Sequence, residues 1–360
     1  MLTRLSVHRF RNLSDLLWDV GPGSHLVTGP NGAGKTSLLE AVYVAATARS
    51  FRTSQLEDCA HRDPAPAASG FLVRAETAGP PLGVLSVSWG EAGLERALDG
   101  KNVPLAAYLG VLPVVVWSGR EDHILAGVPE RRRRMIDAGL VAERPERVGL
   151  LARQRRILAQ KRELLRRRQP GLEAWNRLFA ECSVELAAHR ADWVARLAAG
   201  LRDVLAAAGR SFPPVELRYE CSPSSALDGI EAMLSSLAEA ASEEARQGRP
   251  CIGPHLDRLS ILWGGVDVSR VASAGERKAL GLLLAAAQAA LVVAAGRTPT
   301  VLADDVDAEL DTGALEAVWR VLAQDRQVLA TSSRREISGV LGGVCEWSLE
   351  GGGEVRKIDL

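Results

Sequence analysis

A glycine-rich segment is the part of this 360-residue sequence whose residue types and spacing point most directly to chemistry. It lies between a short apolar strand and an apolar helix and consists of Gly29, Pro30, Asn31, Gly32, Ala33, Gly34, Lys35 and Thr36. Glycines at this spacing let backbone N–H groups converge on phosphate oxygens, at which the following helix points its positive end. Lys35 is predicted to reach the β- and γ-phosphates of a nucleotide, and the Thr36 hydroxyl to hold Mg²⁺. A glycine turn that only caps a helix is the alternative, which the strand–loop–helix context disfavours.

A nucleotide site also requires an acidic residue that holds the metal, and an acidic strand end supplies one. The apolar strand Thr300–Ala303 runs directly into Asp304 and Asp305. Asp304 is predicted to hold Mg²⁺ through water, and Asp305 to orient and polarise the water that attacks the nucleotide. A strand that ends in a solvated acidic turn would explain this pair on its own, so the presence of the phosphate loop decides in favour of a metal site.

A third segment opens the long apolar helix expected at 275–295. Ser273 is a suitable N-cap with Glu276 three residues later, so a capping box alone would explain the pattern. The functional interpretation assigns Ser273 and Gly275 to a signature loop that contacts the γ-phosphate of ATP held by a second subunit. The order of the motifs favours this interpretation. Phosphate loop, inserted segment, signature serine, acidic strand end and Val306–Asp311 follow one another as in ABC-type ATPase heads.

The elements that must position these residues alternate between strand and helix. Strands are expected at 3–10, 26–28, 82–89, 94–104, 114–117, 259–263, 300–303 and 327–330, and Asp99-Gly100 offers a hairpin turn. Helices are expected at 35–47, 147–168, 172–208, 226–246, 275–295 and 313–324. The expected fold class is α/β, an ABC-type P-loop ATPase head with an inserted helical, short coiled-coil-like arm. Its domains are the first half of the head at 1–118, the arm at 119–250 and the second half of the head at 251–360.

The charges are distributed unevenly along the chain. A formal net charge of zero by itself argues against a nucleic-acid-binding protein. However, residues 131–168 contain fourteen Arg or Lys and only four Asp or Glu, whereas acidic residues gather around 239–244 and 304–316. We predict DNA phosphate contacts for Arg49 and Arg52, just beyond the phosphate-loop helix, and for Arg131 and Arg132, although a charge run is often only a solvated helix face.

Composition also bears on the compartment. No stretch approaches the apolar length that spans a bilayer, because the most apolar helix, near 280–295, is interrupted by Gln288. The N-terminus lacks the apolar core of a signal peptide, and five widely scattered cysteines indicate reduced thiols. The expected location is the cytoplasm, with no membrane partner.

The sequence resembles the RecF family of bacterial recombination-mediator ATPases, which are related to SMC heads. The matching segments run over nearly the whole chain: Phe10-Arg11-Asn12, the phosphate loop through Tyr43, Arg49 to Thr53, Leu112 to Val115, Glu130 to Arg133 with Asp137, Gly253-Pro254-His255, Ser273 to Glu276, and Asp304 to Asp311. The resemblance implies ATP and Mg²⁺ as cofactors and a homodimer that ATP closes over duplex DNA near a single-strand gap. Slow, DNA-stimulated hydrolysis would reopen this dimer. It also implies recombinational gap repair and SOS induction, with RecO and RecR as partners that load RecA.

Three positions depart from the pattern of ABC-type heads or of the family. No Q-loop glutamine occurs at 118–122, Leu256 follows Gly253-Pro254-His255 where the family usually has a basic residue, and Thr331-Ser332-Ser333 lacks the switch histidine. The alternative function is the ATP-hydrolysing subunit of a membrane transporter, against which the arm, its arginines and the missing histidine argue. An OLD-type nuclease would need a further domain, for which the eleven residues after Leu349 leave no room.

Overall fold

The chain forms two compact units in a computed structural model that describes residues 1–61, 70–79, 81–119, 122–210, 212–351 and 354–358. The first unit, here called the head, consists of Met1–Leu125, Gly200–Phe212 and Ala272–Leu360. The second unit, here called the arm, consists of Ala126–Ala199 and Pro213–Val271. The arm is thus inserted into the sequence of the head.

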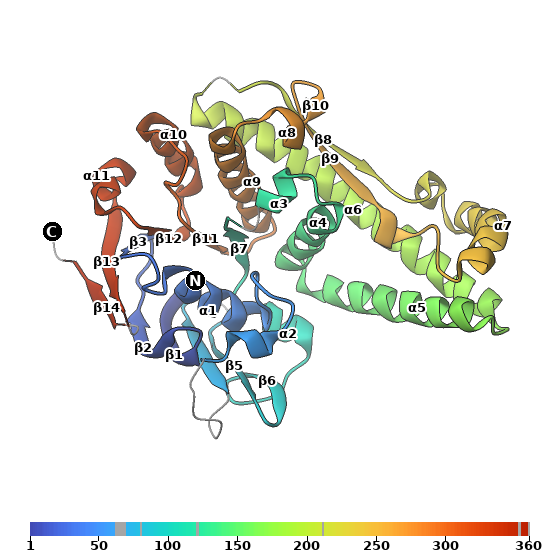
Figure 1. The fold of residues 1–360 in the computed structure, drawn as a ribbon, viewed down its shortest axis with the longest axis horizontal. Helices are drawn as coiled ribbons and strands as arrows, with labels where there is room; N and C mark the ends of the chain where they lie inside the picture. The colour runs from blue at the N-terminus through green and yellow to red at the C-terminus, as the bar shows by residue number, and fades with distance from the viewer. Residues whose placement is uncertain (62–69, 80, 120–121, 211, 352–353, 359–360) are drawn as a thin grey trace. The chain divides into compact units, whose positions relative to one another are not determined.

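A mixed sheet forms the centre of the head (Figure 1). In sheet order its strands are β14 (Glu354–Lys357), β13 (Val344–Glu350), β3 (Ser24–Thr28), β12 (Gln327–Ser332), β11 (Thr300–Ala303) and β7 (Val114–Trp117). All neighbours are parallel except the edge strand β14, which runs antiparallel to β13. Every residue of β11 and β12 is buried, as expected for parallel strands that are covered on both faces. The carboxyl ends of β3, β11 and β12 therefore meet at one edge of the sheet.

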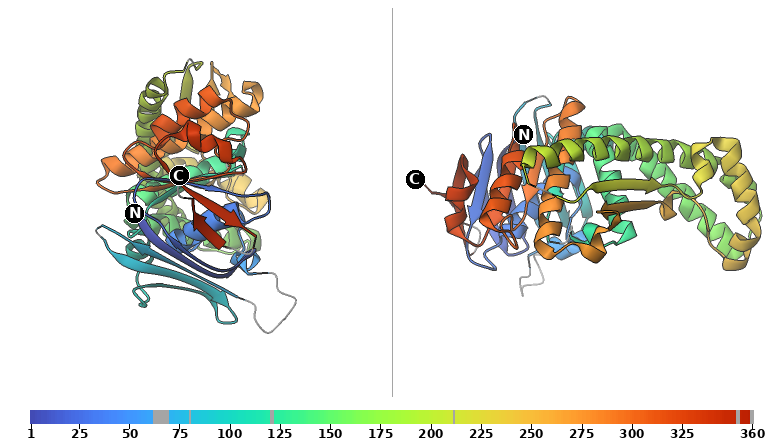
Figure 2. Two further views of the ribbon diagram at one scale, coloured as in Figure 1. Left: turned by 90° about the vertical axis from the view of Figure 1, so that its left-hand side faces the viewer. Right: turned by 90° about the horizontal axis from the view of Figure 1, so that it is seen from above.

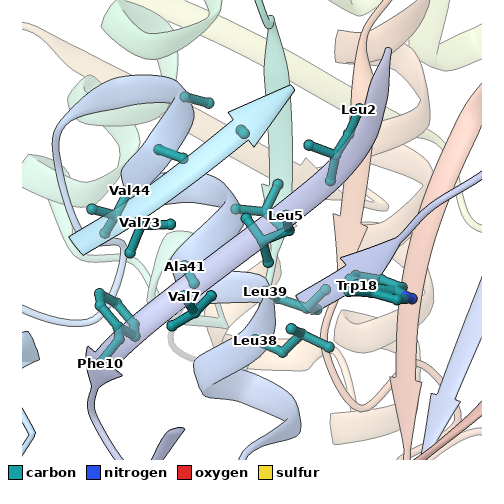
Figure 3. Packing of buried hydrophobic residues seen from close by; sticks show 14 of the residues in the cluster. Leu2, Leu5, Val7, Phe10, Trp18, Leu38, Leu39, Ala41, Val44 and Val73 are labelled. Atoms are coloured by element: carbon teal, nitrogen blue, oxygen red, sulfur yellow. The ribbon is translucent and has the colours of Figure 1, made fainter. Parts of the chain in front are cut away.

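Helix α1 (Lys35–Thr47) packs against an antiparallel sheet as well as against the mixed sheet. The antiparallel sheet has the order β2 (Leu13–Asp19), β1 (Leu2–Phe10), β4 (Phe71–Thr77), β5 (Gly83–Gly90) and β6 (Gly93–Leu98), and Figure 2 shows its strands side by side. Period-two alternation turns Leu5 and Val7 of β1 and Val73 of β4 inward, where they meet Leu38 and Ala41 of α1 (Figure 3). This core fixes the start of α1.

The β5–β6 hairpin differs in one detail from the sequence-based expectation. The two strands are joined by Glu91 and Ala92, because Gly90 pairs with Gly93. Asp99 and Gly100 have φ angles of +51° and +74° and form a tight turn after β6, bridging Leu98 to Lys101. The predicted turn exists, but it does not connect the two predicted strands.

Helix α9 (Ala274–Ala294) is a long head helix in which nearly every residue from Lys278 to Val292 is buried. By length and composition alone this helix could cross a membrane, which corrects the expectation that no segment is long enough, but 72% of its most apolar window is buried inside the protein. A Cβ atom at Gly281 would lie 1.9 Å from the ring of Trp117 in β7, so glycine is required for this contact. Helix α9 is therefore a core helix. The other head helices are α2 (Leu105–Leu109), α3 (Asp122–Leu125), α10 (Thr312–Leu322) and α11 (Ser338–Leu341).

The arm combines helices with a small antiparallel sheet. Its elements are α4 (Pro129–Glu143), α5 (Val148–Arg167), the part of α6 (Leu172–Ala208) up to Ala199, β8 (Val215–Glu220), α7 (Ile230–Gln247), β9 (Arg258–Trp263), β10 (Val266–Asp267) and α8 (Val268–Val271). Leu158 of α5, Phe179 of α6 and Met233 of α7 share one buried cluster. The expected helices at 147–168, 172–208 and 226–246 agree closely with α5, α6 and α7.

The limits of the arm differ from the expected range of 119–250. The arm continues to Val271 because β9 pairs with β8 along its whole length, from Val215↔Trp263 to Glu220↔Arg258. Residues Gly200–Phe212 belong to the head instead. Strand β8 lies in a stretch for which the sequence pattern predicted no element, so its partner strand was assigned to the head.

Candidate nucleotide site

The phosphate loop joins the buried strand β3 to α1. Gly32 and Gly34 have φ angles of +85° and +109°, which residues with a side chain rarely adopt. A Cβ atom at Gly29 would lie 2.3 Å from the carbonyl oxygen of Leu349, so the loop lies directly against β13. These glycines are therefore required by the backbone, as the spacing predicted.

Lys35 lies folded into this loop. Its side chain is buried, and its ammonium group donates hydrogen bonds to the carbonyl oxygens of Gly29 at 2.8 Å and of Pro30 at 3.1 Å. The loop tip, with Asn31 and Gly32, is exposed, whereas Ala33 is buried. The loop thus has a cation at its base and backbone N–H groups around it, the arrangement that binds polyphosphate.

Asn12 braces the loop from outside. Its amide nitrogen donates to the carbonyl oxygen of Gly32 at 2.8 Å, and its amide oxygen accepts a hydrogen bond from Ser37 at 2.8 Å. A Cβ atom at Gly34 would lie 2.7 Å from Leu13 and 3.1 Å from Asn12, so the segment after β1 covers the loop closely. The sequence resemblance included Asn12 but gave it no role; a polar residue at the end of β1 was the signal.

Asp304 connects the two predicted motifs. The Thr36 hydroxyl donates to the carboxylate of Asp304 at 3.0 and 2.9 Å, although the two residues are far apart in the sequence. Thr331 at the end of β12 donates to the same carboxylate at 2.7 Å. Asp304 is buried. The structure therefore brings the predicted metal ligands Thr36 and Asp304 together and adds Thr331, which the sequence pattern did not identify.

Asp305 has a backbone conformation with positive φ, at +47°. Its N–H group donates to the hydroxyl of Thr331 at 2.8 Å, which holds the turn after β11. Loss of hydration, followed by the negative charge of Asp304, raises the pKa of the Asp305 carboxyl, while Lys35 and Lys278 act in the opposite direction. A carboxylate with a raised pKa is a stronger proton acceptor, as its predicted role requires.

Lys278 is a further charged residue of the site that the sequence pattern did not identify. It lies in α9, is buried, and donates a hydrogen bond to the carbonyl oxygen of Asp304 at 3.0 Å. Burial lowers the pKa of its ammonium group, and the nearby carboxylates Asp304, Asp305 and Glu309 oppose this shift. The scarcity of lysine in the chain was the available signal, since a lysine inside an apolar helix needs a partner.

The predicted signature loop lies at the start of α9. Ser273 is the N-cap, its hydroxyl accepts from the Glu276 N–H at 3.3 Å, and the Glu276 carboxylate accepts from the Ser273 N–H at 2.8 Å. The capping box is therefore real. Ser273 is also exposed, and a Cβ atom at Gly275 would lie 2.6 Å from the carbonyl oxygen of Glu309. Contact between this loop and a nucleotide on a second subunit remains a prediction.

The donors in this site fit a magnesium nucleotide. Mg²⁺ prefers oxygen ligands and is commonly held by one or two protein oxygens together with phosphates and water. Thr36 and Asp304 offer such oxygens next to the phosphate loop. Among the described residues no group of three or more His, Cys, Asp or Glu side chains could hold a metal ion by itself. A metal in this site would therefore depend on phosphate oxygens.

The predicted DNA-contacting residues of the head differ in their surroundings. Arg49 is exposed. Arg52 is half-buried and donates to the carboxylate of Glu40 in α1 at 3.1 Å, a carboxylate that also pairs with Arg11 at 2.7 Å. Burial is the largest influence on the pKa of the Glu40 carboxyl and acts to raise it. The hydrogen bonds that Glu40 accepts from Arg11 and Ser50 oppose burial, and the pKa lies below its ordinary value. Arg52 is thus partly engaged in holding its loop to α1.

The two arginines of the arm that were predicted to contact DNA differ in their burial. Arg132 is buried and binds Asp267 through two hydrogen bonds, at 2.9 and 3.2 Å, and the carbonyl oxygen of Leu259 at 2.9 Å. It ties α4 to the arm sheet, so its assignment to DNA contact was wrong. Arg131 is half-exposed. A run of four arginines covers every side of a helix, and one of them must pack inward.

The departures from the ABC pattern also have structural correlates. Thr331 lies beside Asp304 at the end of the strand whose next residues lack the switch histidine. Leu256 is 39% exposed. Arg120 and Glu121, in the segment searched for a Q-loop glutamine, lie outside the described residues.

Known proteins resemble this chain over nearly its whole length. A family model described as an AAA domain matches residues 4–67. The chain is 32% identical to the DNA replication and repair protein RecF of Streptomyces avermitilis, with 95% of this chain and 96% of that protein covered. It is also 32% identical to the protein of the same name from Frankia alni, with 92% and 93% covered.

Solved structures show the same fold. The structure of the recombination mediator protein RecF-ATP matches with a TM-score of 0.86 at 22% identity, covering 99% of this chain and 97% of that one. An SMC head bound to the C-winged helix domain of ScpA matches with a TM-score of 0.57 at 14% identity, covering 100% and 98%. The fold is that of an ABC-type ATPase head with an inserted helical segment. Together with the identity to the curated relatives, this fold shows that the chain belongs to the RecF family.

Proposed function

We propose that this chain is an ATP-dependent DNA-binding protein of recombinational gap repair and SOS induction, and a weak, DNA-stimulated ATPase. The observation that carries the proposal is the hydrogen bond between Thr36 and Asp304, at 2.9 to 3.0 Å, which unites the phosphate loop and the acidic strand end in one site. Asp305 next to it has the raised pKa that suits a group which polarises water.

ATP acts in this proposal as the link between two copies of the chain. The nucleotide binds to the phosphate loop of one subunit, with Mg²⁺ at Thr36 and Asp304. The exposed Ser273 and the N-terminus of α9 on the other subunit contact its γ-phosphate. The dimer closes over duplex DNA near a single-strand gap, and slow hydrolysis reopens it. ATP thereby switches the protein between two states.

The partners follow from the family. Curated relatives carry the name DNA replication and repair protein, and one solved relative is described as a recombination mediator of the RecFOR pathway. We assign RecR and RecO as partners, RecA as the recombinase loaded downstream, and the cytoplasm as the location. Duplex DNA with a gap or a single-strand junction is the proposed nucleic-acid ligand.

ATP hydrolysis with duplex DNA, with lipid vesicles and with neither tests this function. We expect hydrolysis to rise with DNA and not with lipid. Lys35→Met should weaken equilibrium ATP binding by about 100-fold or more, since hydrogen bonds to a charged partner contribute roughly 1.5–3 kcal/mol each. The matched control is the exposed Lys101, whose replacement by Met should leave binding unchanged. Stimulation by lipid alone would support a transporter subunit instead, and normal ATP binding by Lys35→Met would remove Lys35 from the site.

A further inference from the structure

All exposed charged residues of helix α5 of the arm are arginines. Its exposed charged residues are Arg153, Arg155, Arg156, Arg162, Arg166 and Arg167, here called the α5 arginine face. The sole acidic residue of the helix is the half-buried Glu163. The helix's lysine, Lys161, does not belong to this face, because it is fully buried and paired with Glu244 at 2.8 Å. The helix therefore presents one sign of charge to solvent.

Helix α5 has a larger excess of basic residues than the other long helices of the arm. It contains six arginines and one lysine against one glutamate, whereas α4 contains four arginines against three acidic residues and α7 one arginine against four. On α5, Arg166 and Arg167 share Glu163, and Arg153 pairs with Glu185 of α6.

The spacing of the arginines adds repulsion. Arg162 and Arg166 are four residues apart and Arg153 and Arg156 three apart, positions at which like charges destabilise a helix by a few tenths of a kcal/mol per pair. A helix that carries such repulsion on its surface is suited to a polyanion that neutralises it.

The chemistry of the face identifies the kind of polyanion. None of the exposed large hydrophobic residues of the described chain lies in α5, whereas protein interfaces have an apolar centre from which charges are depleted. The helix also contains no aromatic residue on which unpaired bases could stack. Arginine binds phosphate through two parallel hydrogen bonds. These features favour the phosphate backbone of a duplex over a protein or a single strand.

The size of the face suits such a ligand. From Arg153 to Arg167 the helix advances by about 21 Å at roughly 1.5 Å per residue, along which one strand of a duplex presents about six phosphates. A hollow of about 380 Å³ continues the surface at the start of α5, lined by Arg144, Arg147, Arg153 and His189, together with Glu146 and Glu185. Basic side chains thus extend beyond the helix itself.

We propose that the α5 arginine face is a second DNA-binding surface, which contacts the phosphate backbone of duplex DNA without reading its sequence. The proposal rests on the proposed DNA-binding function and assigns part of it to the arm, in addition to the loop with Arg49 and Arg52. Arg132, which the sequence had suggested for this role, is replaced by residues one helix further along the chain.

The test compares two triple variants that each remove three positive charges from the arm. Arg155, Arg156 and Arg162 are replaced by Gln in one, which keeps helix propensity. The matched control replaces Arg177, Arg218 and Arg246 by Gln; these are 64%, 57% and 72% exposed and each has an acidic partner nearby in sequence. The affinity of the full-length protein for a duplex is measured by fluorescence anisotropy over a salt series with ATP, beside ATP hydrolysis without DNA.

With two subunits in the ATP-bound dimer, the α5 variant should lose about five units of the slope of log affinity against log salt, since each of the six lost phosphate contacts contributes about 0.9. Its DNA-independent ATP hydrolysis should equal that of the wild type, and the control should keep the wild-type slope. An unchanged slope in the α5 variant, or an equal loss in both variants, would overturn the proposal. If the wild type binds DNA in those cases, only the role of α5 is refuted. A wild type without affinity for DNA would refute the proposed function itself.

Discussion

At the scale of single residues, the site depends on how Asp304 and Asp305 are held. Two threonine hydroxyls, of Thr36 and Thr331, donate to Asp304, and the Thr331 hydroxyl also accepts from the N–H group of Asp305. A hydroxyl can orient a carboxylate, but it carries no charge that could replace a switch histidine. Proton acceptance in this chain should therefore depend on Asp305 alone.

Asp305→Asn should slow ATP hydrolysis by roughly 100-fold or more, because a positioned general base typically contributes at least that factor. The amide keeps the shape of the side chain but is a poor proton acceptor. ATP binding should persist, so the ATP-bound dimer should accumulate. Light scattering with ATP and Mg²⁺ measures the dimer, and a phosphate-release assay measures turnover. Normal turnover in this variant, or a monomer with ATP, contradicts the role of Asp305.

The raised pKa of Asp305 also has a consequence for stability. Its pKa in the folded protein lies above the ordinary value, so ionisation of this carboxyl opposes folding at neutral pH, and this effect disappears as the pH falls below the ordinary pKa of about 4. Asp305→Asn should therefore raise the Tm of the nucleotide-free protein at pH 7, with a smaller gain towards pH 4. Thermal unfolding at several pH values checks this. A lower Tm at pH 7 would show that the charged form is instead favoured.

Lys278 should act on the same carboxylates. Besides Lys278 itself, the charged groups that influence Asp305 include Asp304, Lys35 and Asp307, so removal of the buried ammonium leaves an excess of negative charge. Lys278→Met should lower stability at pH 7 and move the acidic limb of the ATPase pH profile to higher pH. In the Asp305→Asn background its cost in stability should be smaller, by about 0.5 kcal/mol or more. Strict additivity of the two changes would show that Lys278 contributes only packing.

At the scale of elements, the sequence predicts well whatever depends on local pattern. The phosphate loop, α5, α6, α9, β11 and β12 follow from glycine spacing, helical periodicity and apolar runs, and all lie close to their expected places. The elements that depend on distant partners could not be obtained in this way. Strand β8 is polar on alternate positions and short, and only its pairing with β9 shows that the arm extends to Val271.

The sequence could not show either that the side chain of Arg132 faces the protein interior. Its partner Asp267 lies in β10, more than a hundred residues further along the chain. Four consecutive arginines give no sign of which one faces the interior. The same limit applies to Lys278 and Thr331, whose places beside Asp304 come from helix and strand packing. Contacts between separate elements thus determine the positions of most residues that the sequence pattern assigned wrongly or missed.

The start of α9 offers a prediction at the scale of an element. Ser273→Arg should leave ATP binding to the monomer near normal but block ATP-dependent dimerisation, because a bulky cation would stand where the proposed partner's nucleotide approaches. The change also removes the cap, so Ser273→Ala serves as the control and should cost about 1 kcal/mol of stability without blocking the dimer. Sedimentation with ATP measures dimerisation of both variants. Dimerisation and turnover by Ser273→Arg would refute the proposed sandwich.

At the scale of the whole molecule, a net charge of zero conceals a separation of charge. The α5 arginine face belongs to the arm, and the carboxylates of Asp304, Asp305 and Asp307 belong to the head. A neutral chain exerts little long-range attraction on DNA, so binding should depend on local basic surfaces. Two copies joined by ATP would present each such surface twice.

DNA affinity should therefore be low without nucleotide, rise with ATP, and fall more steeply with salt when ATP is present, because each neutralised phosphate adds to the salt slope. Arg49→Ala should flatten the ATP-dependent slope by about two units, one per subunit, without altering ATP binding by the free protein. Arg356→Ala is the matched control in the head, since Arg356 is 62% exposed and paired with Glu354 in its own strand. Fluorescence anisotropy with duplex DNA, across a salt series with and without ATP, gives all the slopes. Equal slopes in the two nucleotide states would mean that ATP brings no second DNA-binding surface into contact, and the proposed closure of a dimer over DNA would be wrong.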